Sequence, residues 1–145
     1  SYNMEDGSVM TVFRYKEQHQ SYPGRVHGGM ITAMLDEMGL RSLWAKELSE
    51  ETFGVTISLD TKYRKPVPYE TELIGRGVVV KNTSHFIITD SYIMDKDGEI
   101  LANGRIKYIK MDTQKIQEGI EVHEEMPYLV EDGRTEIEGP FFDNL

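Results

Sequence analysis

A short motif near the start of the chain combines residue types that could do chemistry on a carbonyl group. The segment 22–29, Tyr-Pro-Gly-Arg-Val-His-Gly-Gly, runs directly into an apolar stretch that begins at Met30. Backbone N–H groups at the start of a helix attract negative charge, and glycine allows another molecule to approach them closely. Asp36 lies in the middle of this stretch, where an ionised carboxylate is costly unless it has a role. A helix start that stabilises anions, followed by an embedded carboxylate, indicates acyl-transfer chemistry.

Asp36 has no neighbour on its own helix that would explain it as a structural residue. A salt-bridge partner would be expected four residues later, where Leu40 stands, and Arg41 is poorly placed. Glu37 points about 100° away around the helix and is expected on the surface. We therefore interpret Asp36 as a catalytic residue, the alternative being a salt-bridged or capped structural carboxylate.

The elements around this motif form a pattern typical of an α+β protein. Alternating apolar and polar residues predict strands at 9–16, 52–63, 72–81, 85–94 and 100–111. The apolar stretch predicts a mostly buried helix that begins at His27 or Gly28 and ends near Leu48. We expect an antiparallel sheet wrapped around this single helix, with the last four strands forming a meander.

Taken together, these residues resemble the hotdog-fold acyl-CoA thioesterases. His-Gly-Gly opens the helix at His27, Asp36 follows nine residues later, and the next strand ends in Tyr-x-x-Pro-x-Pro from Tyr63 to Pro68. The resemblance is to the phenylacetate-pathway branch and to the mitochondrial acyl-CoA thioesterases, and it covers about residues 9–111. It implies a hotdog fold and hydrolysis of an acyl-CoA to free acid and CoA. It implies no cofactor, because CoA is part of the substrate.

The resemblance also implies roles for individual residues. Asp36 would be the nucleophile or general base, and the backbone N–H of Gly28 would polarise the thioester carbonyl. Thr56 would help to place the water or the carboxylate. Some relatives carry Asn or Gln six residues before the histidine, where this chain has the shorter Ser21. His27 would either contact the substrate or hydrogen-bond to loop backbone.

Further residues are candidates for contact with the rest of the substrate. The substrate-binding candidates are Gly29, Ser21, Lys81, Asn82, Thr83 and Ser84, with Arg25, Arg64 and Lys65 as additional cations for the phosphates of CoA. Met30, Met34 and Met38 recur at four-residue spacing and are interpreted as core residues, or else as the lining of an adaptable acyl pocket. No pair of histidines has metal-ligand spacing, so we predict no metal site.

Composition narrows the class of protein further. The chain has 145 residues, which fits one domain, and no cysteine, which excludes disulfides, thiolate zinc sites and a cysteine nucleophile. No apolar run is long enough for a membrane span, and the first residues lack the layout of a secretory signal. We therefore expect a cytoplasmic protein.

The negative charge is concentrated near the C-terminus. Residues 1–115 carry 16 acidic and 15 basic side chains, whereas residues 116–145 carry nine acidic side chains and a single Arg. We predict a hotdog thioesterase domain over residues 1–111 and an acidic C-terminal extension over 112–145, either a solvated segment or an interaction arm. This charge argues against nucleic acid as a partner.

Two other functions are possible on the same fold. A hydratase or dehydratase acting on acyl thioesters would use a histidine in a different motif. A non-catalytic acyl-CoA binding or sensor module would need an effector segment, and the chain has no basic segment suited to bind DNA. Thioester hydrolysis is the function that the motif favours.

We also predict a homodimer, or a dimer of dimers, whose sheets join into one larger sheet. A single sheet wrapped on one helix leaves an exposed edge, which soluble proteins avoid. Gly28 and Asp36 lie eight residues apart, about 12 Å along one helix, which is too far for both to act on one carbonyl. An antiparallel helix from a two-fold related subunit could bring the start of one helix towards the middle of the other. The predicted partners are thus an acyl-CoA and a second copy of the chain, with no membrane.

Overall fold

The computed structural model describes residues 1–45 and 52–112. The predicted helix end near Leu48 and the C-terminal extension after Asp112 lie outside the described residues. The elements in chain order are β1 (Tyr2–Asn3), β2 (Val9–Phe13), the 3-10 helix η1 (Glu17–His19), β3 (Gln20–Tyr22), β4 (Arg25–Val26), α1 (Gly28–Ala45), β5 (Thr52–Tyr63), β6 (Leu73–Asn82), β7 (Phe86–Met94) and β8 (Ile100–Asp112).

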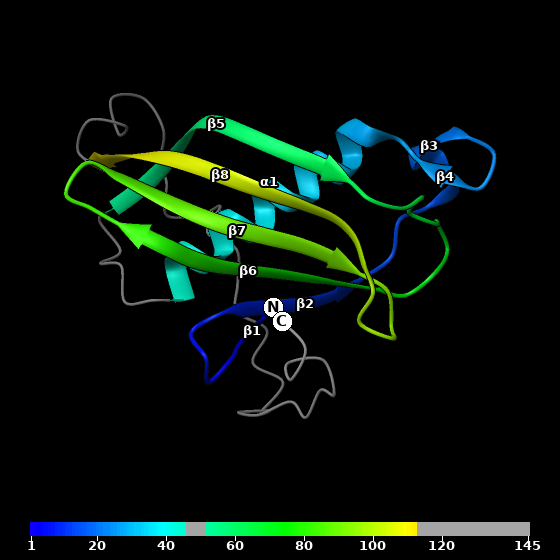
Figure 1. Cartoon of the computed structure of the whole chain (residues 1–145), viewed down its shortest axis with the longest axis horizontal. Coiled ribbons are helices and arrows are strands. Elements are labelled where there is room, and N and C mark those ends of the chain that lie inside the picture. The colour runs from blue at the N-terminus through cyan, green and yellow to red at the C-terminus, as the bar shows by residue number, and fades with distance from the viewer. Residues whose placement is uncertain (46–51, 113–145) are drawn as a thin grey trace, which may run out of the picture.

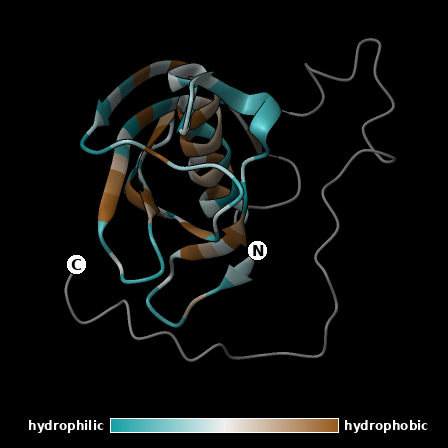
Figure 2. Ribbon diagram, turned by 90° about the vertical axis from the view of Figure 1, so that its right-hand side faces the viewer, coloured by the Kyte–Doolittle hydropathy of each residue, from teal (hydrophilic) through white to brown (hydrophobic). Residues whose placement is uncertain are grey.

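The described residues fold into one antiparallel sheet wrapped around α1, which confirms the predicted hotdog architecture. The six strands lie in the order β1-β2-β6-β7-β8-β5, and β3 pairs with β4 in a separate short hairpin. Figure 1 shows α1 lying against the sheet, with β3 and β4 beside its first turn. Figure 2 looks roughly along the helix and shows the sheet curving around it.

The predicted four-strand meander is wrong in one respect. Strands β6, β7 and β8 follow one another as expected, but β5 pairs with β8 at the far edge of the sheet, and β2 pairs with β6. The connection over residues 64–72 is too long for a tight hairpin and contains Pro66 and Pro68, which cannot donate to a strand ladder. It carries the chain from β5 at one edge of the sheet to β6, an interior strand between β2 and β7. This crossover places the inward face of β5 beside that of β8.

The first predicted strand is also shorter than expected. The alternation over residues 9–16 corresponds to β2, which ends at Phe13, and β1, β3 and β4 were not predicted. β3 and β4 form the segment that leads into α1. Residue Val26 of β4 donates its N–H to the carbonyl of Val67 at 2.9 Å, which ties the helix start to the crossover connection.

The helix packs on the sheet along one face. The side chains of α1 that are buried are Ile31, Leu35, Met38, Gly39, Ser42 and Leu43. Of the three methionines predicted as core residues, only Met38 is fully buried, Met34 is half-buried, and Met30 is exposed. The helix is therefore less buried than its apolar composition suggests, and its free side includes Gly29 and Met30.

Glycine in the sheet allows the helix to come close. A Cβ atom added to Gly77 on β6 would lie 2.0 Å from the carbonyl oxygen of Met38, far inside van der Waals contact. Any larger residue there would push α1 away from the sheet, since a packed interior absorbs little extra volume. No helix in the described part of the chain has the length and apolar character needed to cross a membrane.

Candidate active site

The Asp36 carboxylate lies on the flank of α1 that faces the edge strand β5. Its Oδ1 atom accepts hydrogen bonds from Thr56 Oγ1 and from Tyr108 OH, each at 3.0 Å. Among the residues that the structure describes, the second oxygen, Oδ2, has only a longer contact of 3.3 Å with Thr56 Oγ1. The structure thus brings Asp36 and Thr56 together, as the resemblance implied, and adds Tyr108, which the sequence did not single out.

Strand register explains how the two hydroxyl donors meet. Thr56 on β5 is the direct antiparallel partner of Tyr108 on β8, so both side chains point inward at the same level. A β-bulge between Thr56 and Ser58 follows at once, leaving Ile57 outside the regular ladder. Bulges at a sheet edge re-aim side chains next to a site. Here the bulge lies beside the carboxylate, on the exposed edge of the sheet.

Charged neighbours do not neutralise Asp36. The adjacent Glu37 accepts a hydrogen bond from Arg41 Nε at 2.6 Å, one turn later on the same helix. Among residues 1–45 and 52–112, Asp36 forms no salt bridge. The carboxylate is half-buried and held by neutral hydroxyls. This leaves it free to act as a base or nucleophile, since no cation is paired with it.

At the start of α1, His27 caps the helix. The N–H of Gly29 donates to His27 Nδ1 at 2.9 Å, and the N–H of Met30 donates to the carbonyl of His27 at 2.9 Å. The structure shows the backbone hydrogen bond, with Nδ1 as the accepting nitrogen, and contact between His27 and substrate stays a prediction. The N–H of Gly28 has no hydrogen-bond partner within the described residues, which leaves it available to an oxyanion.

A row of hydroxyl groups extends from the helix start along the face of α1 that carries Asp36. Tyr63 OH donates to the carbonyl of Gly28 at 3.1 Å and lies 2.7 Å from Thr32 Oγ1, which in turn contacts Thr61 Oγ1 at 3.4 Å. Gly28, Thr32 and Asp36 stand four residues apart, so they share one face of α1. That spacing was visible in the sequence and could have identified Thr32 as a residue on the same face as Asp36.

An open depression of about 590 Å³ lies at the helix start. Its lining residues are Ser21, Tyr22, Arg25, Val26, His27, Gly28, Gly29, Ile31, Tyr63, Arg64, Lys65, Pro66 and Val67. It gathers several of the predicted substrate-binding residues, including Ser21, Gly29 and the three cations. Two of these cations already have partners, because Arg64 Nε donates to Asn103 at 2.6 Å and Lys65 pairs with Glu99.

Residues 81–84, the other predicted substrate-binding group, lie elsewhere. They form the end of β6 and the turn into β7, at the end of the sheet opposite the helix start (Figure 1). Thr83 closes this turn, since its Oγ1 donates to the carbonyl of Phe86 at 2.8 Å. The hydroxyl of Ser84 lies 2.8 Å from His85 Nδ1. One chain does not bring Lys81, Asn82, Thr83 and Ser84 to Gly28, so their contact with substrate stays a prediction.

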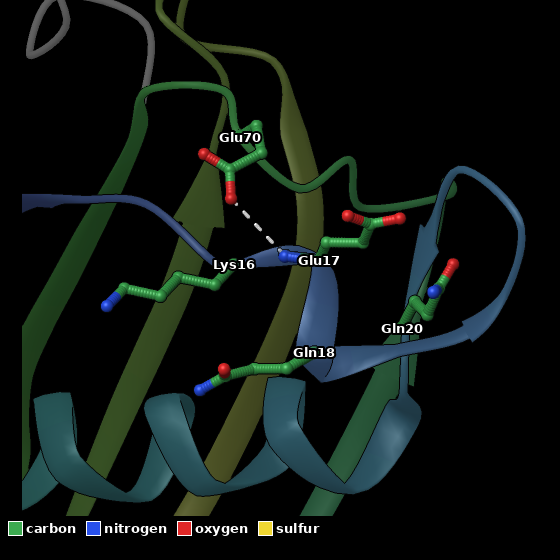
Figure 3. A pocket seen from close by; sticks show the side chains of 5 residues that line it. All are labelled: Lys16, Glu17, Gln18, Gln20 and Glu70. Atoms are coloured by element: carbon green, nitrogen blue, oxygen red, sulfur yellow. Dashed lines mark hydrogen bonds between the residues drawn. The ribbon is translucent and has the colours of Figure 1, made fainter.

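Two other hollows lack the features of a reaction centre. One, of about 510 Å³, is lined by Lys16, Glu17, Gln18, Gln20 and Glu70 (Figure 3). The backbone N–H of Glu17 donates to Glu70 at 3.3 Å, and the other side chains extend apart. A third, of about 290 Å³, is lined by Asp60, Lys62, Asp90, Tyr92, Asn103 and Arg105. No cluster of three or more potential metal ligands occurs in residues 1–45 and 52–112.

Comparison of the sequence with known proteins shows the family to which the chain belongs. Residues 23–102, more than half of the chain, match the family model of the thioesterase superfamily, and the chain belongs to this family. This places it among the thioester hydrolases. Human acyl-coenzyme A thioesterase 13 is 23% identical to it over 100 residues, which is 68% of this chain and 70% of the relative.

Solved structures show the same fold. One is a crystal structure of a thioesterase superfamily protein with 26% identity and a TM-score of 0.66, covering 73% of this chain. The match covers 53% of that neighbour, so the chain spans about half of its length. Another is a hypothetical thioesterase from Streptococcus pneumoniae with coenzyme A, at 20% identity and a TM-score of 0.66, covering 75% of this chain and 82% of the neighbour.

Proposed function

We propose that this protein hydrolyses an acyl-CoA thioester to a free acid and CoA, with Asp36 as the catalytic carboxylate. The observation that carries the proposal is the Asp36 side chain itself, held by two hydroxyl donors at 3.0 Å and paired with no cation among the described residues. The named activity of the human relative and the coenzyme A in the streptococcal neighbour support the choice of substrate.

The reaction needs a stabilised oxyanion and an activated nucleophile. The free N–H of Gly28 at the start of α1 would hydrogen-bond to the thioester oxygen as negative charge develops there, and one such donor is typically worth about 3 kcal/mol of barrier. Asp36 either removes a proton from the attacking water or attacks the carbonyl to form a mixed anhydride. In both cases the C–S bond breaks and CoA leaves as the thiolate. In the second route water then hydrolyses the mixed anhydride, which releases the acid and restores the Asp36 carboxylate. These steps use only groups of the chain, the substrate and water.

Each site takes Asp36 from one subunit and the Gly28 N–H from another. The two residues lie eight positions apart on one helix, or about 12 Å, whereas one carbonyl needs both groups at about 3 Å. β5 lies at the edge of the sheet beside Asp36, and its Val55 and Ile57 side chains are 45% and 53% exposed. A second copy that pairs along this edge would cover those side chains and satisfy the strand's free backbone groups.

Light scattering tests the assembly. A particle of at least two chains at micromolar concentration is expected, either a homodimer or a dimer of dimers. A monomer under those conditions contradicts the shared site.

A thiol-release assay with a panel of acyl-CoAs tests the reaction itself. The unsubstituted protein is expected to release CoA from at least one of them, and Asp36→Asn is expected not to. Glu37→Gln is the matched control, because Glu37 is the neighbouring carboxylate on the same helix but pairs with Arg41. Tight binding of acyl-CoA without turnover would contradict the proposal and favour the alternative, a non-catalytic acyl-CoA binding or sensor module.

A further inference from the structure

Tyr108 on β8 lies beneath Asp36, and its buried hydroxyl contacts both the backbone and the side chain of that residue. The OH atom is 2.9 Å from the Asp36 carbonyl oxygen and 3.0 Å from Oδ1, while the Tyr108 side chain is fully buried. A phenol has one proton, so the hydroxyl shares it between these two acceptors. Tyr108 thereby links the sheet to the helix at the position of the carboxylate.

The surroundings of this hydroxyl are arranged to keep it near the helix. A Cβ atom added to Gly39 would lie 2.4 Å from Tyr108 OH, so any larger residue there would displace the phenol. The same Cβ atom would lie 2.6 Å from Thr89 Oγ1 and 3.3 Å from Ser91 Oγ, and both hydroxyls are buried without a well-formed hydrogen bond among the described residues. Buried hydroxyls without partners are costly, and apolar residues of the same shape would pack as well. Packing alone therefore does not account for this polar group of residues.

The phenol remains a donor over the working pH range. Burial, with a further contribution from the Asp36 carboxylate, raises the pKa of Tyr108 above its ordinary value. The hydroxyl therefore stays protonated whenever the carboxylate is ionised. A hydrogen bond to a charged acceptor is stronger than one between neutral groups.

We propose that Tyr108 is a positioning residue that holds Oδ1 of Asp36, so that Oδ2 is the oxygen that acts on the water or the thioester. This inference rests on the proposed function. Oδ1 receives both short hydrogen bonds, from Thr56 and Tyr108, whereas among the described residues Oδ2 has only the 3.3 Å contact with Thr56. Tyr108 is fully buried, so it reaches the reaction through its contact with Asp36.

Tyr15, which contacts α1 near the start of the helix, offers a matched control. It is also a buried tyrosine, and its OH donates to a carbonyl of α1, that of Met30, at 3.1 Å. Met30 lies six residues before Asp36, and Tyr15 has no contact with the carboxylate. Tyr15→Phe therefore removes a buried hydrogen bond between a tyrosine and the helix without removing a donor to Asp36.

The experiment compares kcat, KM and the pH dependence of kcat for Tyr108→Phe and Tyr15→Phe. For Tyr108→Phe we expect kcat about tenfold lower and KM within about twofold, as the loss of a hydrogen bond to a charged group predicts. The acidic limb of the profile should move to higher pH, because the carboxylate loses a donor that favours its ionised form. For Tyr15→Phe we expect kcat within about twofold and no shift of the limb. An unmoved limb in Tyr108→Phe overturns the proposal.

A second variant decides the question if Tyr108→Phe does not fold. Tyr108→3-fluorotyrosine is nearly isosteric, and its more acidic phenol donates a stronger hydrogen bond. The acidic limb should then move to lower pH, opposite to the effect of phenylalanine, and a limb that stays in place contradicts the inference. The unsubstituted protein and Asp36→Asn are assayed in parallel. No hydrolysis by the unsubstituted protein overturns the proposed function as well, whereas hydrolysis that depends on Asp36 but not on Tyr108 overturns this inference alone.

Discussion

The start and the middle of α1 differ in what they offer to a substrate. At the start, the backbone is exposed, His27 caps the helix through Gly29, and the Gly28 N–H has no partner among the described residues. In the middle, the side chain of Asp36 is half-buried and fixed by hydroxyls from two strands. One region supplies donors for a developing negative charge, and the other supplies a carboxylate. Neither region offers both groups, and the proposed site therefore joins the start of one helix to the middle of another.

The largest effect is expected in the middle of the helix. Asp36→Asn should lower kcat by at least about 10² to 10⁴, because an amide is a poor base and a poor nucleophile. Circular dichroism and light scattering should show an unchanged fold and assembly. Activity within about tenfold of the unsubstituted protein would mean that Asp36 is not the catalytic group.

At the helix start, the loss of one donor should have a smaller effect. Gly28→Pro removes the N–H at the first helical position, where proline is often tolerated, and should lower kcat by about 10² to 10³. Gly28→Ala is the control, because it keeps the N–H and adds a Cβ at 3.3 Å from Tyr63 OH. If the two variants lose activity equally, crowding of Tyr63 explains the loss and the oxyanion role of Gly28 is wrong.

An effect of smaller size is expected at Thr56 on the edge strand β5, which donates a hydrogen bond to the Asp36 carboxylate. Thr56→Val keeps the shape of the side chain and removes the hydroxyl that contacts both oxygens of Asp36. We expect kcat to fall about tenfold, in the range of a single hydrogen bond to a charged group. Thr61→Val, on the same strand but without contact to Asp36, should change kcat less. If kcat falls equally in both variants, the loss comes from disturbed packing of β5 and not from the missing hydrogen bond to Asp36.

The smallest effect is expected from removing the residues after Lys115. All motif residues precede this point, so most of the activity should remain in the thiol-release assay. Loss of activity in a truncated protein that still folds and dimerises would make the acidic segment part of the site.

Much of this account could be predicted from the sequence, because its signals are local. The hydrophobic periodicity placed β5 at residues 52–63 and located the other long strands and α1 to within a few residues. The glycines of the helix start and Asp36 are also local features, since they lie on one helix. Thr56 was named by the resemblance rather than by its own local pattern, and in the structure its hydroxyl lies 3.0 Å from Asp36 Oδ1.

The role of Tyr108 depends on long-range pairing and could not be predicted. Its contact with Asp36 exists because α1 packs against β8, which lies far away in the sequence. Thr56 reaches the same carboxylate because β5 pairs with β8, whereas the order of strands in the sequence suggested a simple meander. The capping role of His27 likewise depends on side-chain geometry, since the sequence allowed either a substrate contact or a backbone hydrogen bond. In both cases the sequence does not show which groups lie next to each other in the folded chain.

Complementation between two inactive variants tests the shared site most directly. Asp36→Asn and Gly28→Pro homodimers should each be nearly inactive, and unfolding and refolding a mixture should produce mixed dimers by random pairing. Half of the dimers would be mixed, each with one intact site, so about a quarter of the unsubstituted activity should return. Mixing without unfolding should restore none. Mixed dimers that are folded and verified by mass, yet show no recovered activity, would contradict the claim that Asp36 and Gly28 act from different subunits.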